Sequence, residues 1–386
     1  MGRTVVLGSK ELIRDMNSKL VLETIIHCNP ISRASISKKL GLTKATISAI
    51  VQDLISSKLV MEIGSDDTSL GRKPILLSFN QKAGFSICID IGVSVLSCMI
   101  SDLLGEHRTI KQIKTPKQSD LVPELIKLIE SMEESYEKLP YGLVGITLGI
   151  HGVTYENEIL FTPYYDISSI NLRQQLSDYF SVPIFLENEA NLSALGERAY
   201  LSNHYKSLAN ISVHTGVGLG VILNDELFNG KNGHAGELGH TIVQMNGRRC
   251  PCGNYGCLEQ YTSERALLLE YTEMTGKNDA TWDDFLNACT LQEKEALELL
   301  DQFVSYMCIC INNLLNSISP EIIIINSSLT NKFPWLISRI INGLTSKVLV
   351  KVPIIPSLRR DSSILLGGIS VSVRNFLGIK NILFHD

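Results

Sequence analysis

Residues 233–263 read GHAGELGHTIVQMNGRRCPCGNYGCLEQYTS and carry the most specific chemical pattern in this chain. His240 lies ten residues before Cys250, and Cys252 and Cys257 complete the group within the next seven residues. One imidazole and three thiolates form a closed four-coordinate set, as in structural zinc sites, and leave no open position for a catalytic water. The loop 240–257 is therefore predicted to bind structural Zn2+. Three reduced cysteines without a metal are the simpler alternative.

Acidic and amide side chains lie on both sides of this loop. Glu237 precedes His240 by three residues and Glu259 follows Cys257 by two, so a bound metal would fix both carboxylates. Upstream, LENEAN at 186–191 ends a predicted strand, and open α/β sheets bind ligands at such strand ends. Several converging donors and acceptors suit the hydroxyl groups of a sugar. Each side chain alone is equally typical of a helix cap or a solvated acid.

The larger part of the chain alternates strands and helices. Apolar β-rich segments are followed by segments of helical period, and this alternation predicts an α/β architecture. The predicted strands lie in 85–102, 109–114, 143–149, 182–187, 208–223 and 321–326. The predicted helices span 121–139, 172–180, 293–318 and 334–346.

The first eighty residues differ from this pattern. An apolar pattern of helical period spans 11–28, and Asn29-Pro30 ends it because a residue before proline leaves the helical region. Ser32 and Thr43 can cap a second and a third helix. The predicted apolar positions are Leu12, Ile13, Met16, Leu20, Val21, Ile25 and Ile26 in the first helix, and Ala45, Ile47, Ile50, Val51, Leu54 and Ile55 in the third.

Two predicted strands, 59–63 and 75–79, are joined by a loop that contains Arg72-Lys73, which fits the wing of a helix-turn-helix domain. An arginine on such a loop can enter a narrow minor groove. Residues 1–80 carry a net charge of +4 and the remainder −9, which favours a DNA-binding head on an acidic body. A domain for protein contacts is the alternative. The residues predicted to contact DNA are Arg33, Thr43, Lys44, Thr46, Ser48, Gln52, Arg72 and Lys73.

Composition restricts the remaining classes of protein. With 386 residues, 44% of them hydrophobic and 19% charged, the chain can form two or three domains with buried cores, and it is not disordered. The sequence contains no run of about 18 apolar residues, so no membrane-spanning helix is predicted. The first residues lack the apolar segment of a secretory signal. An odd count of nine cysteines is typical of a reducing cytoplasm. A cytoplasmic protein without a membrane partner is expected.

The whole pattern resembles the ROK family (repressors, open reading frames and kinases), within it the xylose-repressor-like branch, over nearly the full chain. The motifs that carry the resemblance are NPISRASISKKLGLTKATIS (29–48), LGRKP (70–74), DIGVS (90–94), LENEAN (186–191), HTGVGLG (214–220), GHAGELGH (233–240) and CPCGNYGCLE (250–259). The resemblance implies a winged helix-turn-helix over 1–80 and a two-lobed actin/hexokinase-like (ribonuclease H-like) body. The first lobe would span 84–200, with a C-terminal helix at 364–378 packing back on it, and the second would span 205–386.

The resemblance also implies the ligand and the assembly. A monosaccharide would bind between the lobes, and His240 would bridge sugar and zinc. Homodimers would recognise a two-fold symmetric operator in double-stranded DNA. The expected function is a sugar-responsive repressor of a carbohydrate operon, with xylose as the first candidate effector. His151 and Tyr164 depart from the family near the sugar and leave its identity open. The implied sugar contacts are Asn188, Glu189, Glu237, His240 and Glu259.

The same family contains ATP-dependent sugar kinases, from which this chain departs on the ATP side. Val93 stands where their phosphate loop has a glycine, Glu189 where they have an aspartate base, and Asn326-Ser327-Ser328 where they have a glycine pair. No catalytic residue and no enzymatic activity are therefore expected. Two alternatives stay open, which are a sugar kinase with an accessory DNA-binding domain and a DNA-binding protein whose body serves only dimerisation.

Overall fold

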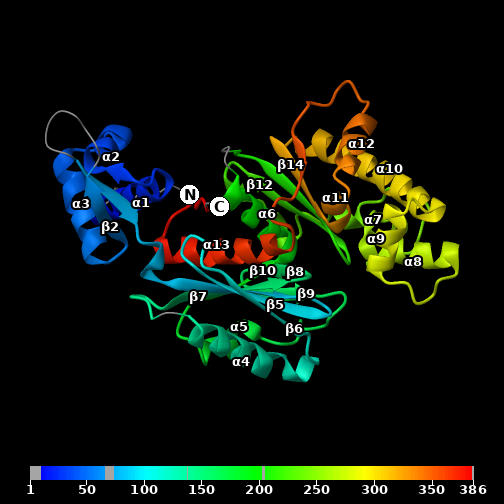
Figure 1. Ribbon diagram of the computed structural model, residues 1–386, viewed down its shortest axis with the longest axis horizontal. Helices are drawn as coiled ribbons and strands as arrows, with labels where there is room; N and C mark the ends of the chain where they lie inside the picture. Colours follow the sequence, from blue (N-terminus) through cyan, green and yellow to red (C-terminus); the bar gives the residue numbers. More distant parts are fainter. Residues whose placement is uncertain (1–9, 66–73, 137, 202–204, 385–386) are drawn as a thin grey trace, which may run out of the picture.

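The computed structural model describes residues 10–65, 74–136, 138–201 and 205–384. Figure 1 shows a small head at one end of the molecule and, beside it, two sheets that helices cover. The predicted α/β class is confirmed, because both sheets have five strands and alternate with helices along the chain. Within the described ranges, no helix combines the length and the apolar character needed to cross a membrane.

The head contains three helices and a small sheet. Its elements are α1 (Lys10–His27), β1 (Ile31–Ser32), α2 (Arg33–Leu40), α3 (Lys44–Ser56), β2 (Val60–Ser65) and β3 (Ile75–Phe79). The three predicted helices are confirmed together with two caps, since Ser32 accepts the N–H of Ser35 and Thr43 that of Thr46. Gly41 has a φ of 68° and makes the tight turn between α2 and α3 that a residue with a Cβ would strain.

The prediction for the outer half of α1 is wrong. Leu12, Ile13, Met16 and Leu20 are between 46% and 56% exposed. Ala45, one of the predicted apolar positions of α3, is exposed as well. Apolar residues occupy two faces of α1, and their period alone does not show which face packs against the head. The buried apolar residues of α1 are Val21, Leu22, Ile25 and Ile26.

Lobe 1, as we name it, is the sheet of strand order β10-β7-β4-β5-β6 with its helices. Its elements are β4 (Phe85–Ile91), β5 (Val95–Asp102), β6 (Thr109–Lys114), α4 (Leu121–Glu134), β7 (Leu143–Ile150), β8 (Val153–Tyr155), β9 (Glu158–Phe161), α5 (Leu172–Ser177) and β10 (Ile184–Asn188). Strand β7 runs parallel to both β4 and β10, so these three strands end at the same edge of the sheet. Side chains that follow them are therefore neighbours in space.

Two helices of lobe 1 are shorter than predicted. Helix α4 ends at Glu134 instead of 139, and α5 ends at Ser177 instead of 180. At the end of α4 the Ser135 hydroxyl donates to the carbonyl oxygen of Met132, a local bond that competes with continuation of the helix.

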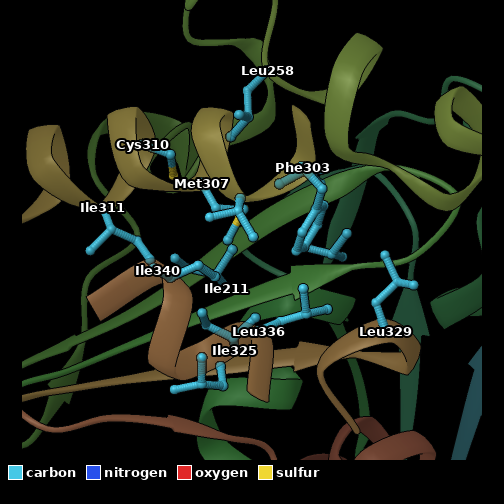
Figure 2. Close-up of a cluster of buried hydrophobic side chains, with 14 of the residues drawn as sticks. Ile211, Leu258, Phe303, Met307, Cys310, Ile311, Ile325, Leu329, Leu336 and Ile340 are labelled. Atoms are coloured by element: carbon cyan, nitrogen blue, oxygen red, sulfur yellow. The ribbon is translucent and has the colours of Figure 1, made fainter. Parts of the chain in front are cut away.

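Lobe 2 is the sheet of strand order β13-β12-β11-β14-β15 with the helices that cover it. Figure 2 shows its core, where Phe303 and Met307 of the long helix pack over Ile211 and Ile325 of the sheet. The elements are β11 (Leu208–Val213), β12 (Val217–Leu223), β13 (Glu226–Leu227), α7 (Glu259–Thr262), α8 (Glu264–Thr275), α9 (Trp282–Thr290), α10 (Lys294–Ser317), β14 (Ile322–Ser327), α11 (Ser328–Lys332), α12 (Trp335–Gly343) and β15 (Ile354–Pro356).

Two helices, α6 (Glu189–Tyr200) and α13 (Ser363–Leu377), join the lobes. They pack closely against each other, and α13 also covers β4 and β7 (Figure 1). Their close approach depends on glycine, because a Cβ built on Gly367 would lie 1.8 Å from the carbonyl oxygen of Leu192. Helix α6 therefore connects the strand edge of lobe 1 to the sheet of lobe 2 as one packed unit.

The chain closes with a C-terminal segment, residues 378–384, that lies against both the head and the body. Ile379, Ile382 and Phe384 are buried in the same apolar cluster as the inner face of α1. The backbone N–H of Phe384 donates to the carbonyl oxygen of Ala199 in α6 at 2.7 Å. A second contact joins the head to lobe 1, where the Tyr141 hydroxyl donates to the Ser57 carbonyl oxygen at 2.8 Å.

Candidate functional site

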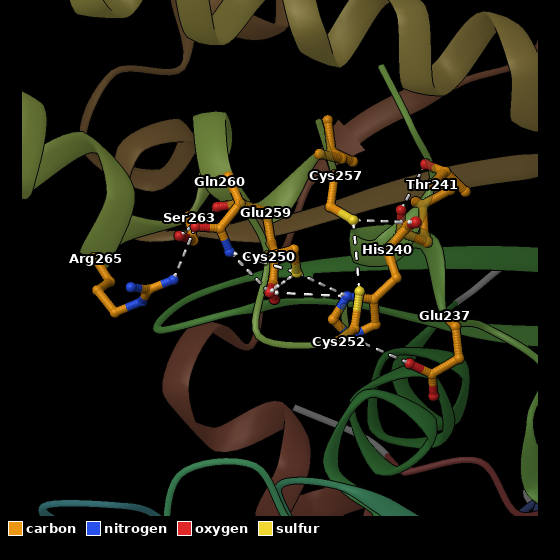
Figure 3. Close-up of polar contacts among 12 residues, drawn as sticks. Glu237, His240, Thr241, Cys250, Cys252, Cys257, Glu259, Gln260, Ser263 and Arg265 are labelled. Carbon is orange, nitrogen blue, oxygen red and sulfur yellow. Dashed lines mark hydrogen bonds and ion pairs between the residues drawn. The ribbon is translucent and has the colours of Figure 1, made fainter. Parts of the chain in front are cut away.

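The structure brings the four predicted metal ligands together. The ligand atoms of His240, Cys250, Cys252 and Cys257 all lie within 4.8 Å of one another. Cys250 Sγ is 3.5 Å from His240 Nδ1, and the Sγ atoms of Cys252 and Cys257 are 3.7 Å apart. Figure 3 shows the four side chains pointing at a common centre. One nitrogen and three sulfur donors at these separations can hold a metal ion.

Local backbone geometry folds the loop back on itself. Isolated bridges pair Ile242 with Cys257 and Arg249 with Tyr255. Gly256 has a φ of 80°, and a Cβ there would lie 1.7 Å from a backbone oxygen, so this turn requires glycine. Leu258, completely buried, anchors the end of the loop in the core of lobe 2 beneath α10 (Figure 2).

Two of the three thiols of this cluster, Cys250 and Cys257, are buried, whereas Cys252 is exposed. Burial raises the pKa of Cys250, and its bond to the Glu259 carboxylate, 3.2 Å away, raises that pKa further. Burial raises the pKa of Cys257 in the same way. The neutral thiol is thus favoured at Cys250 and Cys257 in the protein alone, and a cation would supply the charge that stabilises their thiolates.

His240 connects the cluster to two carboxylates. Its Nδ1, the nitrogen near Cys250, also lies 3.8 Å from Glu259 Oε1, while its Nε2 lies 3.8 Å from Glu237 Oε2 (Figure 3). Glu259 begins α7 and is only 4% exposed. One imidazole can therefore contact a metal through Nδ1 and a ligand near Glu237 through Nε2.

Asn188 and Glu189 stand at the junction of β10 and α6. The Asn188 Oδ1 atom accepts the N–H groups of Ala190 and Asn191 and so caps α6. Its Nδ2 donates to the Gly152 carbonyl oxygen and to Glu189 Oε2, both at 2.8 Å. Burial raises the pKa of Glu189. The cap thus fixes an amide and a carboxylate at the strand edge of lobe 1.

All five predicted sugar contacts line one cavity of about 110 Å³ between the lobes. Asn188 and Glu189 face it from the end of β10 and the start of α6, and Glu237, His240 and Glu259 face it from lobe 2. Further walls come from the turn between β11 and β12 and from residues that follow β7 and β9. Such a cavity, with a few convergent polar groups, is the usual form of a small-molecule site.

Comparison with known sequences gives the family of the chain. The sequence profile described as "ROK family" matches residues 86–371, more than half of the chain. The chain belongs to the ROK family. Two ROK relatives are named xylose repressor. That of Bacillus spizizenii is 34% identical over 97% of this chain and 99% of its own length, and that of Bacillus subtilis is 33% identical over 96% and 98%.

Solved ROK structures share the fold. A ROK family transcriptional regulator, described as a homologue of the Escherichia coli MLC protein, has a TM-score of 0.81 at 24% identity and covers 95% of this chain and 98% of its own. A ROK family glucokinase from Streptomyces griseus, in complex with glucose and AMPPNP, has a TM-score of 0.66 at 21% identity, covering 75% of this chain and 99% of its own. The predicted actin-like, kinase-type body is thus confirmed at the level of fold.

The cavity also borders an ion pair that the sequence alone did not reveal. His151 follows β7 and Asp90 lies in β4, and His151 Nε2 is 2.8 Å from Asp90 Oδ1. Burial lowers the pKa of His151, but the carboxylates of Asp90 and Glu189 outweigh it and raise the pKa to about 9. The two residues lie at the ends of β4 and β7, which are neighbouring parallel strands. A sequence-based prediction that these two strands pair would have indicated that Asp90 and His151 are close.

The structure shows where the residues that depart from the ROK kinase pattern lie. Val93 lines the cavity with Glu189, so a branched side chain stands in its wall. Asn326 is buried, and its Nδ2 donates to Ser363 Oγ at 2.8 Å and Ser193 Oγ at 3.2 Å. Ser328 donates to Glu264 Oε1 at 2.6 Å. The side chains of Asn326 and Ser328 therefore make their hydrogen bonds to other residues of the protein.

The predicted DNA contacts lie in the head, far along the chain from the cavity. Helix α3 lies at the outer end of the molecule, at the left in Figure 1. Thr43, Lys44, Ser48 and Gln52 are exposed, and Thr46 is half-buried. Arg33 is half-buried and pairs with Glu62 Oε1 at 2.8 Å. Arg72 and Lys73 fall outside the described residues.

Proposed function

We propose that this ROK protein is a sugar-responsive, DNA-binding transcriptional repressor of a carbohydrate utilisation operon, with xylose as the first candidate effector. The observation that carries the proposal is the convergence of Asn188, Glu189, Glu237, His240 and Glu259 on one small cavity. Relatives named xylose repressor and, at 25% identity over 90% of this chain, N-acetylglucosamine repressor from Escherichia coli O6:H1 support it.

The head supplies the DNA-binding part of this proposal. The helices α2 and α3, joined at Gly41, and the paired strands β2 and β3 support the proposal of a winged helix-turn-helix. In this proposal α3 enters the major groove and presents Lys44, Ser48 and Gln52, while Arg33, Thr43, Thr46, Arg72 and Lys73 support binding. Two copies of the chain would bind the two halves of a symmetric operator.

We assign a structural role to the metal site and choose zinc as its ion. His240, Cys250, Cys252 and Cys257 form a nitrogen–sulfur donor set of the kind that zinc prefers, with no ligand position left for water. The ion would stabilise the thiolates and hold His240 and Glu259 in place for the sugar. The proposal includes no catalytic residue, because Val93, Glu189 and Asn326–Ser328 depart from the kinase pattern.

In this proposal, helix α6 connects the cavity to the head, so that a change at the cavity can alter the position of the head. It begins at the cavity with Asn188 and Glu189 and ends where Ala199 accepts the N–H of Phe384, in the segment that contacts α1. A sugar that binds better to a closed cleft favours that conformation by its difference in affinity, and no more. Loss of operator binding on adding sugar is the expected direction.

A thermal-shift screen of the full chain against monosaccharides, with and without Mg·ATP, tests the proposal. A ligand at a hundredfold excess over Kd stabilises the native state by about 2.7 kcal/mol. We expect one sugar to raise the unfolding midpoint, ATP to add nothing, and the same sugar to change binding to a DNA duplex selected by the protein from a random library. A separate shift by ATP with phosphate transfer would favour the kinase, and no shift with any sugar would favour a body used only for dimerisation.

A further inference from the structure

One wall of the cavity is apolar and comes from a single loop of lobe 1. Phe161 ends β9, Pro163 and Tyr164 follow it, and all three line the cavity together with the carboxylates of lobe 2. Tyr164 is 36% exposed, so part of its ring faces solvent and part faces the cavity. A polar floor and an aromatic wall together suit a sugar ring, which has hydroxyl groups at its edge and C–H groups on its faces.

Tyr164 also crosses from lobe 1 to lobe 2. The Arg265 guanidinium carbon lies 5.8 Å from the centre of the Tyr164 ring, within the range of a cation–π contact. Arg265 belongs to α8, on the far side of the cleft. The two residues therefore form a bridge at the cavity wall, and the position of the tyrosine depends on an arginine of the other lobe.

Arg265 is itself held by the residues of the sugar floor. Its Nη2 donates to Gln260 Oε1 at 3.4 Å, and Gln260 Nε2 donates to Glu259 Oε1 at 3.1 Å (Figure 3). Across the cleft, the Arg265 guanidinium contacts Tyr164 in two ways, through a side-chain hydrogen bond with the tyrosine and through the cation–π contact with its ring. The chain of contacts thus runs from Glu259 through Gln260 and Arg265 to Tyr164.

We propose that Tyr164, held by Arg265, is a specificity-determining residue that limits the effector to a single sugar ring. This inference rests on the proposed function, because it concerns the same cavity. Tyr164 lines the cavity and is 36% exposed, so it stands where the cavity meets solvent. In this inference a second sugar unit would have to extend past the tyrosine ring. The contact with Arg265 keeps the ring from rotating away to admit it.

The test compares one-ring and two-ring probes on the wild-type chain and on Tyr164→Ala. The probes are D-xylose and D-glucose and their β-1,4-linked disaccharides, xylobiose and cellobiose, with binding measured by calorimetry. Tyr164→Ala is expected to lower the preference for one ring over two by at least tenfold, since the wall is removed, and to weaken monosaccharide binding several-fold through lost ring contact. Tyr155→Ala is the matched control, because Tyr155 lies on β8, is 37% exposed and does not line the cavity.

Arg265 provides a second variant that leaves the tyrosine in place. Arg265→Ala is expected to lower the same preference by less than Tyr164→Ala, and Arg265→Lys is expected to restore part of it, because a cation over the ring is kept. An unchanged preference in Tyr164→Ala, with monosaccharide still bound, would overturn the inference and leave the proposed function intact. Failure of the wild-type chain to bind any of the four probes would count against both, starting with the sugar function.

Discussion

The cavity proposed to bind a sugar and the outer face of α3 proposed to bind DNA are two surfaces built in opposite ways. The cavity gathers residues from strand ends, from a helix start and from the metal loop, and each is fixed by neighbours, as Asn188 is by the N–H groups it caps. The outer face of α3 takes Lys44, Ser48 and Gln52 from one helix and leaves them exposed. The first surface depends on the whole tertiary structure, whereas the second requires only that one helix form.

The largest effect is expected where the cavity depends on the metal loop. Cys252→Ser should lower the metal content from about one ion per chain to nearly none, measured by plasma mass spectrometry. Sugar affinity should fall at least about tenfold, because His240 and Glu259 lose the ion that positions them. DNA binding without sugar should stay unchanged if the two surfaces are independent.

Cys28→Ser is the control for this variant. Cys28 is a half-buried thiol in the head, outside the metal cluster, and its replacement should leave metal content and sugar affinity unchanged. Sugar affinity that survives complete loss of the metal from Cys252→Ser would show that the metal loop does not support the cavity.

A smaller effect is expected from the ion pair in the cleft. His151 should titrate near 9 in an NMR titration, and Asp90→Asn should move its pKa toward the ordinary value of about 6.5. Because the folded-state pKa is raised, the stabilisation is complete below about pH 6.5 and is lost as the pH rises through 9. Urea unfolding at pH 6 and pH 9.5 should therefore differ more in the wild type than in Asp90→Asn. A wild-type pKa near 6.5 would contradict the pairing in solution.

The smallest effect on the fold is expected on α3. Lys44→Ala should weaken binding to the selected duplex and reduce the slope of log affinity against log salt by about 1, as for one lost phosphate contact. Its free energy of unfolding should stay within about 0.5 kcal/mol of the wild type, since the side chain is exposed. Lys127→Ala on α4 is the control, and an equal salt slope for both variants would remove Lys44 from the DNA interface.

The comparison also explains what the sequence could predict. The metal ligands lie within eighteen residues, and the caps Ser32 and Thr43 act on residues three positions away, so spacing and local chemistry sufficed. Motifs of the family located the five residues proposed to contact a sugar, which the structure places around one cavity. These features are set by short stretches of chain, whose geometry depends little on the rest of the molecule.

Features that depend on packing between distant segments were missed or wrong. His151 and Asp90 are sixty-one residues apart, and only the pairing of β4 with β7 makes them neighbours. Helix α6 is absent from the predicted elements, because a helix cap was only one of the roles open to the polar residues of LENEAN, and the structure shows that Asn188 caps this helix. For α1, period could not distinguish the packed face from the face that holds Leu12 and Met16.

The C-terminal segment links the position of the head to the order of synthesis. The ribosome completes the head early, but Ile379, Ile382 and Phe384, which lie against it, belong to the last eight residues of the chain. At 5–20 residues per second, the remaining 300 or so residues take roughly 15–60 s to make. During that time the nascent head has helix α3 but lacks the part of its support that the C-terminal segment provides. A chain cut short by a premature stop would lose that support before it lost any residue of the sugar cavity.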